Sequence, residues 1–186
     1  MIYLIGGIAK SGKSYVARRM TLQTGIPHFS TDYLMMSLFR GNPGLGIDPE
    51  ASDAVVSKAL EPYLEGMVRA MAENGIQYIL EGVHLTPDAA TRWEARFPGR
   101  IRSVFLGYRT VSPADKWREL QLHAKDVEND WFSSYTPQRR DETLRFLILD
   151  SEILYRKTEE TGHCYVEIQD IVRQADDIIR FLLAEK

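Results

Sequence analysis

Cysteine and long apolar runs are scarce in this chain of 186 residues. Its only cysteine, Cys164, excludes an internal disulfide framework. The apolar start at residues 1–5 is short and has no basic segment, so it does not have the form of a secretory signal. No apolar run approaches the roughly 20 residues that a membrane-spanning helix needs. We therefore expect a cytoplasmic protein in a reducing compartment, without a membrane partner.

An excess of basic residues is also absent. The chain has 23 Lys and Arg residues against 26 Asp and Glu residues, a formal net charge of −3. Domains that bind duplex nucleic acid normally carry a basic excess, so nucleic acid is disfavoured as the main partner. Hydrophobic residues make up 44% and charged residues 26%, which is typical of a globular protein. The length predicts a single domain over residues 1–186, as a monomer or a homodimer.

Segments with strand patterns alternate with segments with helix patterns along the chain. We expect strands over residues 2–5, 27–31, 76–81, 101–106 and 165–168. Helices are predicted over residues 13–24, 87–97, 137–162 and 171–182. Two more are predicted with one end each: a helix that contains Pro62, with a kink or restart there, and ends at residue 74, and a helix that begins at residue 113. Such alternation predicts an α/β fold with three layers and a five-stranded parallel sheet.

One motif carries a specific chemistry. Residues 7–14, GIAKSGKS, match the phosphate-binding pattern G-x-x-x-x-G-K-[ST] without a mismatch, between the first strand and the first helix. Backbone N–H groups of such a loop surround phosphate oxygens, Lys13 brings a positive charge to the outer phosphates, and the Ser14 hydroxyl can ligate Mg²⁺. The predicted nucleotide-binding residues are Gly7, Ile8, Ala9, Lys10, Ser11, Gly12, Lys13, Ser14 and Tyr15. Lys10 occupies a variable position of the motif. A lysine that only contacts solvent explains it as well as one that adds charge over the phosphates.

The rest of the sequence narrows the class of nucleotide-binding protein. It lacks the guanine-reading N-K-x-D of Ras-type GTPases, and the apolar run 78–80 ends in Glu81-Gly82 instead of the Asp-Glu of larger ATPases. A small phosphoryl-transfer kinase remains. The phosphate loop, Ser30-Thr31-Asp32, and the string LEGVHL at residues 80–85 together resemble the small P-loop kinases, which include adenylate, shikimate and gluconate kinases.

The LEGVHL string is most similar to 2-phosphoglycerate kinases and related kinase-like proteins. The resemblance implies the P-loop NTPase fold with a short helical lid, ATP and Mg²⁺ as cofactors, and transfer of phosphate to a hydroxyl of a small metabolite. Two alternatives stay open: a kinase of a nucleotide or a nucleic-acid end, and a nucleotide-binding regulator without transfer activity.

Acidic residues follow the second and third predicted strands, where ligands bind in parallel α/β sheets. Asp32 lies 18 residues after Ser14 and can accept the proton of an acceptor hydroxyl, or orient that hydroxyl; the resemblance implies the same role. The alternative is that Asp32 caps a helix beginning at Tyr33.

Glu81 ends an apolar strand, where a carboxylate needs a cation or hydrogen-bond donors. A Mg²⁺-bound water or an acceptor hydroxyl would satisfy it, and the alternative is a pair with an arginine. His84 either contacts an acidic acceptor or shapes its loop. Asp32, Glu81 and His84 are thus the predicted acceptor-binding residues, and Ser14 and Glu81 the predicted metal site.

A helical lid is expected over about residues 109–140, because this segment concentrates cations after the fourth strand and breaks near residues 133–137. Cations around the transferred phosphoryl group favour catalysis. Arg118 is the chosen catalytic candidate, beside Lys13 and Asp32. The alternative is a solvated helix, since acidic residues are interleaved with the basic ones.

Overall fold

The computed structural model describes residues 1–124 and 132–184. Its centre is a parallel sheet in the order β2-β3-β1-β4-β5, which confirms the predicted α/β fold with five strands. The strands are β1 (Ile2–Gly7), β2 (His28–Ser30), β3 (Tyr78–Glu81), β4 (Ile101–Gly107) and β5 (Tyr165–Glu167).

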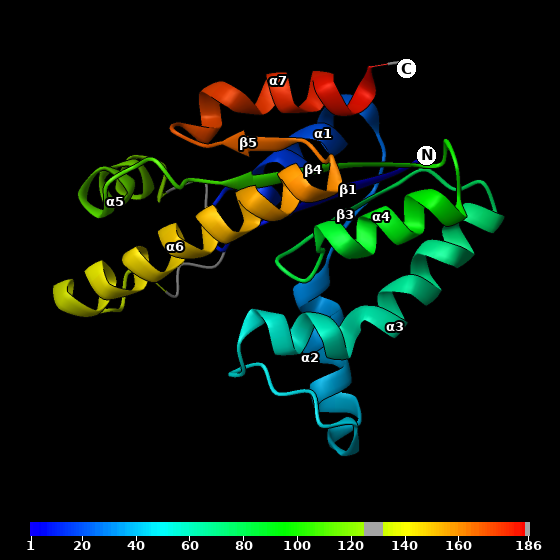
Figure 1. The fold of residues 1–186 in the computed structure, drawn as a ribbon, viewed down its shortest axis with the longest axis horizontal. Helices are drawn as coiled ribbons and strands as arrows, with labels where there is room; N and C mark the ends of the chain where they lie inside the picture. The colour runs from blue at the N-terminus through cyan, green and yellow to red at the C-terminus, as the bar shows by residue number, and fades with distance from the viewer. Residues whose placement is uncertain (125–131, 185–186) are drawn as a thin grey trace.

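Helices cover both faces of the sheet, as Figure 1 shows. The helices are α1 (Lys13–Thr24), α2 (Thr31–Gly41), α3 (Asp53–Glu73), α4 (Pro87–Arg96), α5 (Pro113–Leu122), α6 (Pro137–Thr161) and α7 (Ile171–Leu183), with a 3-10 turn, η1 (Pro43–Leu45). None of the described helices is long and apolar enough to cross a membrane.

Alternation along β1 divides the core into two layers. Ile2 and Leu4 pack with α3 and α4 on one face, whereas Tyr3 and Ile5 pack with α1 and α7 on the other. Every residue of β1 is buried, as expected of a central strand covered on both faces.

The parallel register brings the carboxyl ends of three strands together. Ile5 of β1 pairs with Glu81 of β3, and Ser30 of β2 pairs with the same Glu81. The phosphate loop, the start of α2 and the end of β3 therefore meet at one edge of the sheet, the edge where α/β proteins bind ligands.

The predictions around Asp32 need correction. The predicted second strand reaches Thr31, but α2 already begins there, and the side chain of Ser30 accepts the hydrogen bond from the Asp32 N–H that caps the helix. The capping interpretation of Asp32 is therefore wrong. Of the two outcomes predicted at Pro62, a kink or a restart, the structure agrees with the kink: α3 continues through Pro62, and Figure 1 shows that it bends part-way along its length.

The segment predicted as a lid contains α5 and the start of α6, and residues 125–131 of it lie outside the described residues. Phe132 is buried, and its ring packs against those of Trp117 and Tyr135 at centroid distances of 5.8 Å each. The side chains in this part of the segment are thus packed like those of a protein core. That the segment acts as a lid stays a prediction.

Candidate active site

The phosphate loop requires glycine at two positions. Gly7 has a φ of 134°, and a Cβ there would collide with the carbonyl oxygen of Leu106 on β4. Gly12, the N-cap of α1, has a φ of 86°, and a Cβ there would meet Ile171 of α7. The loop is therefore fixed between β4 and α7, and its peptide N–H groups lie at the amino end of α1, a favourable place for an anion.

The Lys13 side chain lies against the phosphate loop. Its side chain is largely buried, and Nζ donates a hydrogen bond to the Ile8 carbonyl at 2.7 Å. Burial lowers the pKa of Lys13, and the nearby charges of Glu81, Asp32 and Asp53 act in the opposite direction. An ammonium group held so close to the loop amides is placed to meet the phosphates of a nucleotide.

Ser14 and Glu81 form the predicted metal-binding pair. The Ser14 hydroxyl donates to Glu81 Oε1 at 3.1 Å, and Glu81 is only 3% exposed. No group of three or more His, Cys, Asp or Glu among the described residues could hold a metal ion. A hydroxyl with one carboxylate fits Mg²⁺, which uses one or two protein carboxylates, waters and substrate phosphates as ligands.

His84 and Asp32 lie near each other but in different surroundings. His84 is buried, its Nδ1 lies 2.9 Å from Thr31 Oγ1, and 3.8 Å from Asp32 Oδ1. Burial lowers the pKa of His84, although the charge of Asp32 opposes this shift. Asp32 itself has a side chain that is 63% exposed. The structure thus places Asp32 where a ligand can reach it and His84 beneath it.

A cavity of about 440 Å³ brings most of the predicted residues together. Its described lining comes from the phosphate loop, α1, β2, α2, the end of β3, α5 and the start of α7. Among the predicted residues it includes Ala9, Lys10, Gly12, Lys13, Ser14, Tyr15, Asp32 and Glu81. His84 and Arg118 are not part of this lining.

Arg118 points away from the cavity. Its side chain is 78% exposed and pairs with Asp115 at 2.9 Å on the same helix, α5. Instead, Glu119 and Leu120 of α5 and its C-cap residue, His123, line the cavity. Nothing in the sequence distinguishes these three positions from Arg118, because which face of an exposed helix meets a cavity depends on packing.

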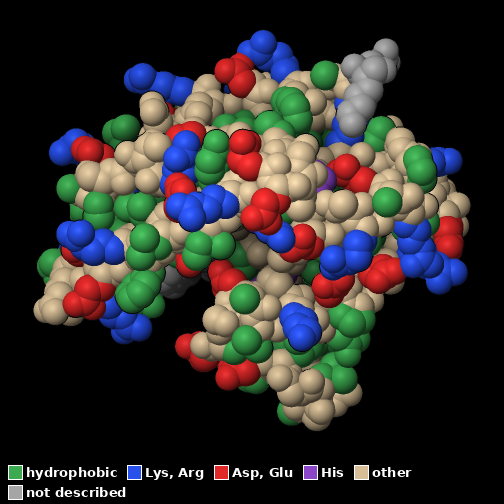
Figure 2. All heavy atoms as spheres, in the orientation of Figure 1, with side chains coloured by type: hydrophobic (Ala, Val, Ile, Leu, Met, Phe, Trp, Pro, Cys, Tyr) green, Lys and Arg blue, Asp and Glu red, His purple; other side chains and the backbone are tan. Residues whose placement is uncertain are grey.

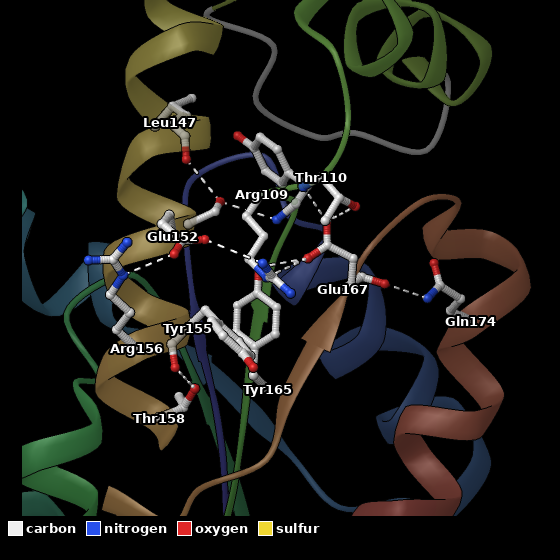
Figure 3. Close-up of polar contacts among 12 residues, drawn as sticks. Arg109, Thr110, Leu147, Glu152, Tyr155, Arg156, Thr158, Tyr165, Glu167 and Gln174 are labelled. Atoms are coloured by element: carbon white, nitrogen blue, oxygen red, sulfur yellow. Dashed lines mark hydrogen bonds and ion pairs between the residues drawn. The ribbon is translucent and has the colours of Figure 1, made fainter. Parts of the chain in front are cut away.

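Arg109, the first cation of the predicted lid, belongs to a polar cluster at the ends of β4 and β5 (Figure 3). Its guanidinium lies 4.0 Å from the centre of the Tyr155 ring and within 3.4 Å of Glu152 and 3.6 Å of Glu167. Glu167 also accepts hydrogen bonds from Thr110 N and Oγ1. Two carboxylates therefore neutralise Arg109, which connects α6 to the sheet.

Tyr108 joins the phosphate loop to α5, a contact that the sequence did not predict. The Tyr108 hydroxyl donates to the Ala9 carbonyl at 2.7 Å. The ammonium of Lys116, which is 2% exposed, lies 4.2 Å from the centre of the Tyr108 ring and bonds to Glu119 at 2.8 Å. Burial raises the pKa of Tyr108 well above its usual value, so the hydroxyl stays protonated as a donor.

We expect Tyr108→Phe to weaken ATP binding about 5- to 10-fold, because an unpaired buried carbonyl costs about 1 kcal/mol or more and the loop loses its tether. Titration calorimetry measures the affinity. Tyr63→Phe, at a partly exposed position on α3, is the matched control and should leave it unchanged. Equal ATP affinity in Tyr108→Phe and the parent protein would show that the tether does not position the loop.

Solved structures match the chain over nearly its whole length, whereas no protein-family model and no curated protein matches it. A gluconokinase from Sinorhizobium meliloti 1021 superposes with a TM-score of 0.58 at 19% identity, over 97% of this chain and 91% of that chain. A shikimate kinase from Bacteroides thetaiotaomicron gives a TM-score of 0.58 at 14% identity, over 98% of both chains.

A shikimate kinase from Acinetobacter baumannii, in complex with shikimate, gives a TM-score of 0.53 at 18% identity, over 98% of this chain and 92% of that chain. The fold is therefore the one that these small P-loop kinases share. This confirms the fold that the sequence resemblance implied.

Proposed function

We propose that the protein is an ATP- and Mg²⁺-dependent kinase that phosphorylates a hydroxyl group of a small molecule. The observation that carries the proposal is one cavity lined by Lys13, by the Ser14–Glu81 pair and by the exposed carboxylate of Asp32. Residues that can bind phosphate, hold Mg²⁺ and accept a proton from a hydroxyl thus line one cavity of about 440 Å³. The shared fold with kinases of gluconate and shikimate supports the same function.

The nucleotide end of the cavity is formed by the phosphate loop, α5 and α7. Lys13 and the loop amides bind the β- and γ-phosphates. The adenine ring lies between the end of α5 and the start of α7. The residues that line the cavity there beside Gly12 are Leu120, the C-cap residue His123, Ile171 and Val172. His123 Nε2 lies 3.2 Å from Asp170 Oδ1, so the C-cap of α5 contacts the N-cap of α7 beside this end.

Transfer requires an acceptor hydroxyl beside the γ-phosphate. The hydroxyl oxygen forms a bond to the γ-phosphorus, the bond from that phosphorus to the bridging oxygen breaks, and ADP leaves. Asp32 takes the hydroxyl proton or orients the hydroxyl, because its carboxylate is exposed to the cavity. Ser14 and Glu81 would hold Mg²⁺, which when bound neutralises charge on the phosphates.

The acceptor is proposed here only as a small hydroxyl compound. The finer interpretation, a 2-phosphoglycerate-like acceptor, rests on the LEGVHL string at residues 80–85, of which Glu81, Gly82 and Val83 line the cavity. It has no support from the solved structures compared above, which are kinases of other acceptors. 2-Phosphoglycerate therefore belongs in any acceptor panel as one member.

The function is tested by incubating the protein with ATP, Mg²⁺ and a panel of hydroxyl metabolites and measuring acceptor-dependent ADP release. At least one acceptor should raise ADP release well above the rate with ATP alone, and its phosphorylated product should be found by mass spectrometry. ATP binding without transfer to any acceptor would favour a regulator without transfer activity.

We expect Glu81→Gln to raise the Mg²⁺ concentration for half-maximal rate about 10-fold, because the amide removes the negative charge next to Ser14 while keeping its shape. ATP affinity should change much less. Glu142→Gln, an exposed position on α6, serves as the control. An unchanged Mg²⁺ dependence would assign Glu81 to the acceptor or to structure.

We propose that the segment over about residues 109–140 closes over bound phosphates, since transfer requires exclusion of water. Trypsin should cut the free protein early at the exposed Arg118 and Arg139, and ATP with Mg²⁺ should slow both cuts. Peptide mapping by mass spectrometry reports the order of cleavage. Resistance of both sites without ligand, or no protection by ligand, would identify the segment as a fixed layer.

A further inference from the structure

The end of the cavity opposite the nucleotide has its own composition. From β2, α2 and the end of β3, its described lining residues are mainly aromatic or acidic, and none of them is lysine or arginine. The lysine and arginine residues of the described lining, Lys10, Lys13 and Arg18, come instead from the phosphate loop and α1. The acceptor end therefore provides negative charge, from Asp32 and Glu81, and its described lining contains the imidazole of His28 but no lysine or arginine.

An aromatic surface adjoins these carboxylates. Phe29 and Tyr33 both line the cavity, with ring centroids 6.4 Å apart and planes inclined by 59°. The Tyr33 side chain is left 60% exposed although it is large and lies next to Asp32 in sequence. An exposed aromatic face beside a carboxylate attracts a cation through both the ring and the charge.

Two further carboxylates lie near this end. The charge of Asp53, at the start of α3, is close enough to raise the pKa of both Lys13 and His84. Partial burial and the same Asp53 charge raise the pKa of Asp150 on α6. Figure 2 shows acidic side chains on both sides of the recess between α6 and the part of the molecule formed by α2 and α3. An anion entering here would meet like charges.

We propose that the acceptor carries a positive charge, and that it is an amino sugar, an aminocyclitol or an amino alcohol. Its hydroxyl meets Asp32, its ammonium group lies against the rings of Phe29 and Tyr33, and the charges of Asp53 and Asp150 outside the described lining add to the attraction. The inference rests on the proposed function, because it takes the space beside Asp32 as the acceptor site. It disagrees with the 2-phosphoglycerate resemblance, since that acceptor is an anion.

The test uses acceptors matched in size that differ in charge, such as glucosamine, glucose and gluconate, together with a broad panel of amino alcohols and aminocyclitols and with 2-phosphoglycerate. Affinity is measured by calorimetry with the protein saturated with Mg²⁺ and a non-hydrolysable ATP analogue. We expect the best amine to bind about 10-fold or more tightly than its neutral counterpart, and the acids to bind more weakly than either. Tighter binding of an acid or a neutral member, or no binding by any amine, overturns the proposal.

Two double variants test whether Asp53 and Asp150 attract the ammonium group of the acceptor. Asp53→Asn/Asp150→Asn should lower the affinity for the amine about 10-fold and leave the affinity for the neutral counterpart within about 2-fold. Asp141→Asn/Glu159→Gln removes the same number of charges from exposed positions of α6 and should change neither affinity. Equal losses for amine and neutral ligand in the first variant would show that these carboxylates do not hold an ammonium group.

The two proposals fail in different ways. If ATP binds and a neutral or acidic compound is the preferred acceptor of phosphate, the cationic acceptor is wrong and the kinase function stands. If amines bind preferentially but no phosphate moves to any of them, the charge preference stands and the kinase function is wrong.

Discussion

Lys13→Ala is expected to lower ATP affinity about 10- to 100-fold, because a charge-assisted interaction with phosphate contributes about 1.5–3 kcal/mol. Turnover should fall further, by a factor of about 10² to 10³, since charge on the transferred group grows in the transition state. Calorimetry and the rate of ADP release measure the two effects.

The comparison variant is Lys10→Ala, which makes the same change in the same loop. Lys10 Nζ lies 5.9 Å from the centre of the Phe132 ring, and Lys10 also lines a second cavity of about 330 Å³ with Trp117 and Arg140. Its replacement should therefore change ATP affinity less than about 5-fold. If Lys13→Ala and the parent protein bind ATP equally, the loop does not hold the nucleotide.

Asp32→Asn is expected to reduce turnover by a factor of about 10² to 10⁴ with little change in ATP affinity, because it removes only the proton acceptor. The melting temperature should also change little, since Ser30 caps α2 and the Asp32 side chain is 63% exposed. Activity per folded molecule and thermal unfolding are the two measurements.

Asp141→Asn, at an exposed position of α6, is the matched control and should affect neither quantity. Normal turnover per folded molecule in Asp32→Asn, with or without a loss of stability, would remove Asp32 from the chemistry.

Patterns local in the chain predicted most of the fold. The strands β1, β3 and β4 were predictable because they are almost entirely buried and end in glycine or glutamate. The phosphate loop was predictable because the backbone conformation at Gly7 and Gly12 and the charge of Lys13 restrict each position to few residue types. These constraints act over short stretches of sequence.

The remaining features depend on contacts between distant segments. Ser30, Thr31 and Asp32 are all good helix caps, so only the structure identifies Ser30 as the cap of α2. Lys116 and Arg118 are two residues apart on an amphipathic helix, yet one is buried against Tyr108 and the other is exposed. Which one faces inward depends on how α5 packs against α6 and Tyr108, which charge patterning alone does not specify.

Transfer of phosphate to an acceptor is tested by following the γ-phosphate itself. The protein is incubated with Mg²⁺ and ATP labelled at the γ-position, with and without the hydroxyl panel, and the products are separated and identified by mass spectrometry. A kinase should give label in a phosphate ester of one acceptor, with one ADP formed per ester, and this ester should be lost in Asp32→Asn. Label found only in inorganic phosphate, at a rate that no acceptor changes, would contradict the kinase function.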